Sequence, residues 1–200
     1  HDERKVIVWN LPSCESVSLS TSSGQVQLAS IGTFIAPQLR RLNAVVCNES
    51  LPPLIDGSKR LERVFSRAGR EVPTEALSDE TVRALAGSWP DAVVLQLPHS
   101  LAVPAHAACS LGKHWPKLRT LRLTLTRSTD SEVVAHLLHS TPPCIASVHV
   151  LRGGLRVLSD EEFAPGPLPK CTPRDQLRYL QLQLADDDVI AACAPMFAAV

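Results

Sequence analysis

The segments 89–97 and 115–123 both begin with Trp-Pro and continue with apolar residues at the spacing L-x-x-L-x-L. In the earlier segment, Ala92 holds the first of the three apolar positions. The chain contains only three tryptophans, and two of them occupy the same place in this pattern, 26 residues apart. Such a fixed period indicates stacked supersecondary units, because a single unit of this size has no neighbour to cover its apolar face.

The same pattern can be placed at several other points of the chain. Its first apolar position falls at residues 14, 39, 92, 118, 145 and 177, with weaker candidates at 61 and 197. Most of these positions follow a proline by two residues, as Pro37 precedes Leu39 and Pro143 precedes Ile145. The intervals range from 20 to 32 residues, so the longer units are expected to contain insertions.

Helix signals lie between the predicted strands. Ser78 opens a run whose apolar residues share one helical face. Thr129-x-x-Glu132 is a capping-box pattern, and the carboxylates at 186–188 suit the positive end of a helix dipole. A further helix is predicted within residues 105–114. Each unit is therefore expected to run strand, turn, helix and back.

With cysteine or another small residue near the junctions, the form P-x-L-x-x-L-x-L resembles the cysteine-containing subclass of leucine-rich repeats. This subclass includes F-box-associated and ribonuclease-inhibitor-like repeats. The resemblance implies an α/β fold, a leucine-rich-repeat solenoid with a curved parallel sheet and helices on its convex side. It also implies one repeat array over residues 1–200, with irregular insertions near 48–77 and 152–174.

The charge balance and the cysteine content indicate which kind of partner and which compartment to expect. Lys+Arg and Asp+Glu balance at 20 each, so nucleic acid is not indicated, since phosphate binding favours a basic excess or stripe. The six cysteines are scattered, which favours free thiols in a reducing intracellular compartment, with the cytoplasm as the expected location. No apolar run is long enough for direct membrane insertion. A start without Met and an apolar end suggest a piece of a longer chain.

The sequence carries no recognisable motif for catalysis or for cofactor binding. Neither a P-loop nor a G-x-S-x-G elbow is present. His106-x-x-Cys109 and His136-x-x-His139 have spacings that could place two ligands on one helical face, but no C-x-x-C pair completes a zinc site. We therefore expect a non-enzymatic protein with no cofactor and no metal.

The side chains between the inward leucines of each strand are the candidate partner-binding residues. In a solenoid they would form one mostly polar surface on the concave side, suited to protein partners in a larger complex or merely solvated. The expected function is a scaffold or structural subunit. The alternatives are the substrate-recognition region of an F-box-type ubiquitin-ligase adaptor and an unrecognised α/β enzyme. The candidate residues are Asn43, Gln96, Thr120, Arg122, His149, Tyr179 and Gln181.

Overall fold

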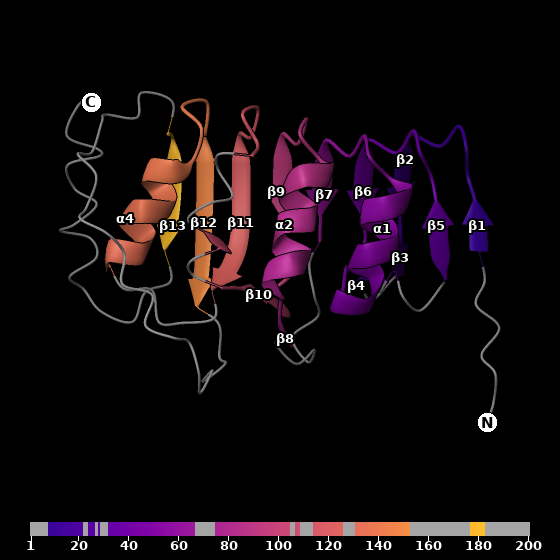
Figure 1. The fold of residues 1–200 in the computed structure, drawn as a ribbon, viewed down its shortest axis with the longest axis horizontal. Coiled ribbons are helices and arrows are strands. Elements are labelled where there is room, and N and C mark those ends of the chain that lie inside the picture. The colour runs from indigo at the N-terminus through magenta and orange to yellow at the C-terminus, as the bar shows by residue number, and fades with distance from the viewer. Residues whose placement is uncertain are drawn as a thin grey trace.

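The computed structural model shows an α/β protein whose strands are mostly parallel and whose few helices lie beside them (Figure 1). Several predictions fall outside the residues that it describes: the repeat near 197, the helix starts at Thr129 and 186–188, and most of the insertion near 152–174. The described residues are 8–21, 24–26, 28, 32–66, 75–104, 107–108, 114–125, 131–152 and 177–182.

Most of the described strands belong to one nine-stranded sheet. Its main row consists of β2 (Ser16–Ser18), β6 (Arg41–Asn43), β7 (Arg63–Phe65), β9 (Val94–Gln96), β11 (Thr120–Leu125), β12 (Ser147–Arg152) and β13 (Tyr179–Leu182). Neighbouring strands in this row are parallel and follow one another in chain order. Two short strands, β8 (Glu75–Ala76) and β10 (Leu101–Val103), extend the sheet beside the carboxyl-terminal end of β11.

Corresponding positions of the sequence pattern face each other across the main row. Leu95 pairs with Leu121, and Leu121 pairs with Val148, although these steps span 26 and 27 residues of chain. All three side chains are fully buried, with 0% of their surface exposed. The predicted alignment of these segments is therefore confirmed. The same column of the sheet also contains Val17, Leu42, Val64 and Leu180.

A β-turn precedes the strands of most units. In this turn the backbone N–H of the first apolar position donates to the carbonyl oxygen three residues earlier, as Leu118 does to Trp115 at 3.1 Å. Pro116 is the second residue of the turn, where the proline ring already fixes the backbone angle that a common turn requires. The Trp-Pro pair therefore marks the entry into a strand. The same bond occurs at Cys14, Leu39, Ala92 and Ile145, at 3.1, 2.9, 3.0 and 3.1 Å respectively.

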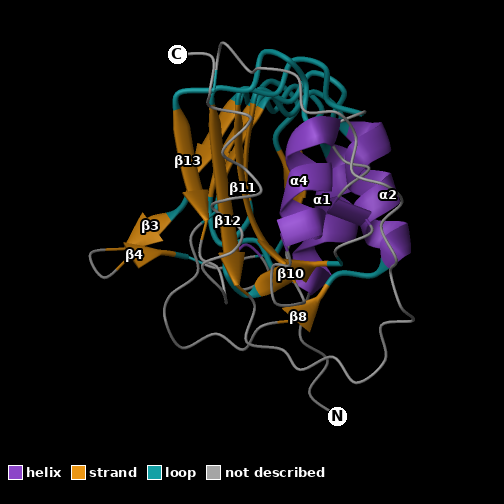
Figure 2. Ribbon diagram, turned by 90° about the vertical axis from the view of Figure 1, so that its left-hand side faces the viewer, coloured by secondary structure: helices purple, strands orange, loops and turns teal. Residues whose placement is uncertain are grey.

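The helices α1 (Leu51–Gly57), α2 (Asp79–Ser88) and α4 (Ser131–Ser140) cover one face of the sheet (Figure 1 and Figure 2). The predicted start of α2 is confirmed, because Ser78 is its N-cap and its hydroxyl oxygen accepts the backbone N–H of Thr81 at 3.1 Å. Among the residues described, no helix is long and apolar enough to cross a membrane.

The two tryptophans of the repeated pairs belong to the core. Trp89 is 1% exposed and Trp115 is 0% exposed, and both lie in one continuous cluster of buried residues. A large aromatic side chain at each of these corners removes much apolar surface from water. This burial favours a packing role for both tryptophans over a role in stacking against a ligand.

The segment 48–77, where the pattern predicted an irregular insertion, contains the short helix η2 (Asn48–Ser50) followed by α1 and β7. β7 takes a regular place in the main row between β6 and β9. Its unit lacks the last apolar residue of the pattern and carries Ser66 instead, which is 1% exposed. The Ser66 hydroxyl oxygen accepts the backbone N–H of Val46 at 2.8 Å, so a buried polar pair replaces a leucine contact.

Four short strands near the amino terminus lie outside the main sheet. β1 (Val8–Asn10) and β5 (Thr33–Ile35) form a parallel pair. Gly57, at the end of α1, lies against β5: a Cβ added to this glycine would be 2.7 Å from the Phe34 carbonyl oxygen. β3 (Ser20–Thr21) and β4 (Gly24–Gln25) form an antiparallel hairpin. In Figure 2 this hairpin projects on the side of the sheet away from the helices.

Candidate interaction surface

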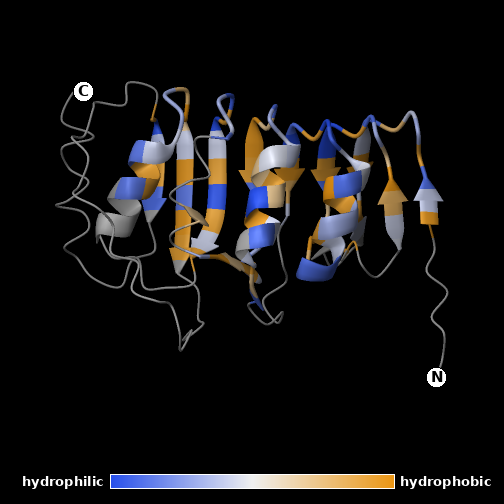
Figure 3. Cartoon of the chain, in the orientation of Figure 1, coloured by the Kyte–Doolittle hydropathy of each residue, from blue (hydrophilic) through white to orange (hydrophobic). Residues whose placement is uncertain are grey.

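The face of the main sheet opposite α1, α2 and α4, here called the open face, carries partly exposed residues that alternate with buried ones along the first part of β11 and β12, whereas Thr124 and Leu151 further along are buried. On β11, Leu121 and Leu123 are 0% exposed, whereas Thr120 and Arg122, which alternate with them, are half-buried. The alternation of hydrophobic and hydrophilic residues along β11 and β12 is visible in Figure 3. Because successive side chains of a strand point to opposite faces, the polar set shares the open face.

All seven residues predicted from the sequence lie on strands of this sheet. Asn43, Gln96, Arg122, His149 and Gln181 occupy one continuous row of paired positions, and Thr120 and Tyr179 occupy a parallel row. The structure also places Phe65 and Arg63 of β7 in these rows, which further contain Ser16, Ser18, Arg41, Val94 and Ser147. We call nine of these residues the open-face ladder: Asn43, Arg63, Phe65, Gln96, Thr120, Arg122, His149, Tyr179 and Gln181.

Three ladder residues on β12 and β13 contact one another through hydrogen bonds and a ring contact. The Nδ1 atom of His149 lies 3.0 Å from Oε1 of Gln181, and the Tyr179 hydroxyl donates to the same oxygen at 3.4 Å. Because an amide oxygen only accepts hydrogen bonds, the His149 Nδ1 atom carries a proton in this contact. The rings of His149 and Tyr179 lie 4.8 Å apart at a tilt of 32°. Tyr179 nevertheless keeps 51% of its surface exposed.

Arg122 is held by a histidine that the sequence pattern did not reveal. Its Nη2 atom lies 2.9 Å from Nε2 of His99, a residue in the turn between β9 and β10. A guanidinium only donates hydrogen bonds, so Nε2 accepts and His99 is neutral in this contact. Partial burial and the nearby Arg122 charge both lower the pKa of His99, which favours the same neutral form.

Charged residues mark the edge of the open face where the strands begin. The residue immediately before each strand forms a row in which Arg40 and Glu62 make an ion pair at 3.0 Å. In the turns just outside this row, Lys117 pairs with Asp91 at 2.6 Å. The hydrogen bond and charge of each partner lower the pKa of Asp91 and raise the pKa of Lys117. These contacts join side chains of neighbouring units, 22 and 26 residues apart in the chain.

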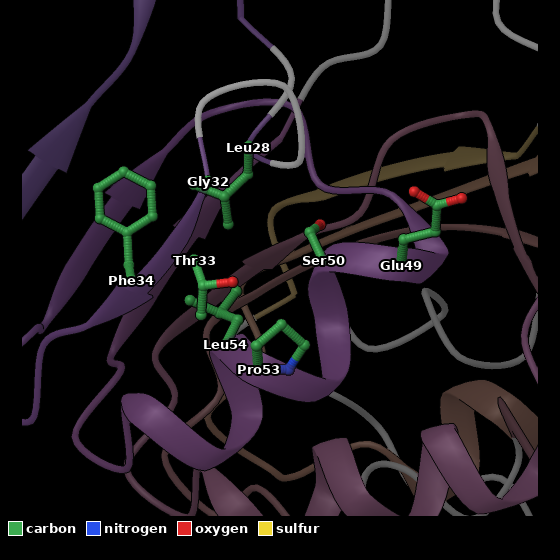
Figure 4. Close-up of a pocket in the computed structure, with 8 residues that line it drawn as sticks. All are labelled: Leu28, Gly32, Thr33, Phe34, Glu49, Ser50, Pro53 and Leu54. Carbon is green, nitrogen blue, oxygen red and sulfur yellow. The ribbon is translucent and has the colours of Figure 1, made fainter. Parts of the chain in front are cut away.

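Described residues of the open face line two hollows. One of about 600 Å³ is lined by residues at the beginnings of β7, β9 and β11, and one of about 470 Å³ by residues of β2, β6 and β7. A smaller cavity of about 180 Å³ lies away from this face, between the start of α1 and the strand β5 (Figure 4). Among the described residues that line this small cavity, Glu49 is the only charged one.

Of the two residue pairs with metal-ligand spacing, only His136 and His139 lie within the described residues. His106 and Cys109 lie outside the described residues, and His136 and His139 lie on α4. Within the described ranges, no group of three or more His, Cys, Asp or Glu side chains could hold a metal ion. A comparison of the chain with models of known protein families and with curated protein sequences finds no match to either.

Proposed function

We propose that this chain is a leucine-rich-repeat solenoid and a non-enzymatic protein-binding module, acting as a scaffold or structural subunit of a larger assembly. The partner binds across the open-face ladder. The observation that carries the proposal is the alignment of polar and aromatic side chains along one face, strand after strand, above an apolar column that is buried from β2 to β12. Stacked repeats create extended surfaces of this kind, and such surfaces suit macromolecular partners.

The composition of the open-face ladder supports a protein partner. Tyrosine and arginine are the residue types that dominate binding energy at protein interfaces. Tyr179 and Arg122 are held by His149, Gln181 and His99, so they lose less conformational freedom when a partner docks. An exposed aromatic ring that is already fixed by its neighbours has the character of an interface anchor.

The shape of the surface favours a macromolecule over a small molecule. Small-molecule sites are enclosed and bury most of their ligand. The two hollows on the open face instead lie along the strands, at the beginnings of β7, β9 and β11 and over β2 and β6. We also propose a reducing compartment, which is supported by the free thiols of Cys14, Cys47 and Cys144.

The experiment compares proteins that co-purify with three forms of the chain under identical conditions. One form is unchanged, one carries Arg122→Ala with Tyr179→Ala, and the control carries Glu80→Ala with Arg83→Ala on the exposed side of α2. Quantitative mass spectrometry should find a partner that the control retains and the open-face variant loses. Thermal melts of all three forms verify that each is folded. A partner retained equally by all three forms, or no partner at all, contradicts the proposal.

A further inference from the structure

The larger hollow on the open face has a distinctive lining, and we call it the Arg63–Arg119 groove. It runs across the beginnings of three adjacent strands, β7, β9 and β11. Arg63 is the first residue of β7, Arg119 immediately precedes β11, and both side chains are exposed. The lining residues are Arg63, Val93, Val94, Pro116, Lys117, Arg119, Thr120 and Cys144.

The positive charge of this groove is only partly balanced by neighbouring carboxylates. Lys117 is paired with Asp91 at 2.6 Å. Arg63 and Arg119 make no ion pair with any carboxylate in the part of the chain that the structure describes. Glu62, in the same pre-strand row as Arg119, pairs instead with Arg40 at 3.0 Å. Two guanidinium groups therefore line the hollow without an ion-pair partner among the described residues.

The excess of positive charge at the groove contrasts with the zero net charge of the whole chain. Lys+Arg and Asp+Glu balance at 20 each over the whole sequence. Several described carboxylates belong to η2, α1 or α2 on the helix side, including Glu49, Asp56 and Glu80. Cations thus gather at the groove although the chain carries no net charge, and such a patch attracts a partner of opposite charge.

The residues that line the groove suit a ligand with carboxylate side chains next to apolar ones. A guanidinium binds a carboxylate through two parallel hydrogen bonds, which makes arginine specific for this group. Between the two arginines, Val93 and Val94 are half-buried and provide an apolar floor. β7 and β11 are two strand spacings apart, about 10 Å, and an extended chain covers that distance in about three residues.

We propose that the Arg63–Arg119 groove binds an extended acidic segment of a partner protein. Carboxylates about three residues apart pair with Arg63 and Arg119, and an apolar side chain between them packs on Val93 and Val94. This inference rests on the proposed protein-binding function and specifies the chemistry of the partner. A protein segment is favoured over a phosphate backbone because Lys117 and Arg40 are neutralised by Asp91 and Glu62, which leaves Arg41 of β6, in register with Arg63, as one further cation beside the groove.

The test selects random peptides of about 12 residues, displayed on phage, against the full chain, because a segment of that length spans the groove in extended form. Enriched sequences should carry Asp or Glu about three residues apart with apolar residues between them. A fluorescein-labelled peptide of the enriched sequence is then titrated by fluorescence anisotropy. Its affinity should fall as the salt concentration rises, since exposed ion pairs are screened.

Matched variants locate the site. Arg63→Ala with Arg119→Ala should weaken binding of the enriched peptide by roughly tenfold or more, the size expected for arginine anchors. Lys59→Ala with Arg83→Ala removes the same charge from exposed side chains near the helices, where Lys59 contacts Asp56 and Ser88. This control should change the affinity by less than about twofold, because long-range charge effects are screened.

Two results would overturn the acidic-segment proposal while leaving protein binding intact. The first is enrichment of non-acidic peptides whose binding is lost on Arg122→Ala with Tyr179→Ala. The second is equal weakening by the groove variant and its charge-matched control. A single-stranded uridine oligonucleotide that binds more tightly than the peptide, and loses affinity in the groove variant, would assign the groove to nucleic acid instead. If no peptide or protein contacts the open face, the proposed function fails as well.

Discussion

Replacing Leu121 with alanine tests the aligned apolar column at its centre. Leu121 is 0% exposed and pairs with Leu95 on one side and Val148 on the other, both also fully buried. Truncating a buried leucine removes apolar contacts and leaves a cavity between neighbouring units. Such replacements cost about 3–5 kcal/mol where the surroundings relax little. The expected loss here is about 3 kcal/mol or more, because strands on both sides hold the space open.

Circular dichroism melts measure this loss. A change of 1 kcal/mol shifts the midpoint of a chain of this size by about 2–4 °C, so Leu121→Ala should lower Tm by roughly 10 °C. Arg122→Ala, one residue further along the same strand, is the matched control and should stay within about 0.5 kcal/mol. Leu121→Asp should unfold the middle of the array, because it buries a charge without a partner. Equal effects of the Leu121 and Arg122 variants would refute the register.

Further predictions concern a cap, a buried indole and a histidine. Ser78→Ala should cost about 1 kcal/mol in urea unfolding, because α2 loses its N-cap bond. Trp115→Phe should cost less than the roughly 3–5 kcal/mol of Trp115→Ala, because the ring remains and the indole N–H has no hydrogen-bond partner among described groups. His99 has a lowered pKa, so the unfolded chain binds its proton more readily. The stability that comes from the neutral form of His99 should therefore be fully present above about pH 6.5 and should decrease below it. In thermal melts at several pH values, His99→Gln should reduce this decrease.

The repeat period of the sequence was sufficient to predict which strands form the main row of the sheet. The strands around Leu95, Leu121 and Val148 could be aligned because three apolar positions recur in each and only one register buries all of them. The proline that precedes the strand in most units was a second, independent marker, since it suits one position of the preceding turn. These two constraints also placed the seven predicted ladder residues on strands of one sheet.

The residues that the pattern missed depend on contacts distant in sequence. Phe65 and Arg63 escaped the prediction because their unit ends in Ser66, whose burial is compensated by a hydrogen bond to Val46. His99 lies in a turn, and only the folded chain brings it to Arg122, 23 residues away. The strands β1, β3, β4 and β5 lie outside the repeated pattern, so its period gave no signal for them.

The most direct test of the account asks which face of the sheet a partner touches. A photoreactive amino acid is placed either at Gln181, exposed on the open face, or at Glu80, exposed on α2. Each form is irradiated together with the partner recovered by co-purification, and covalent products are separated and identified by mass spectrometry. The account predicts cross-linking from Gln181 and not from Glu80. Cross-linking from Glu80 alone would contradict it.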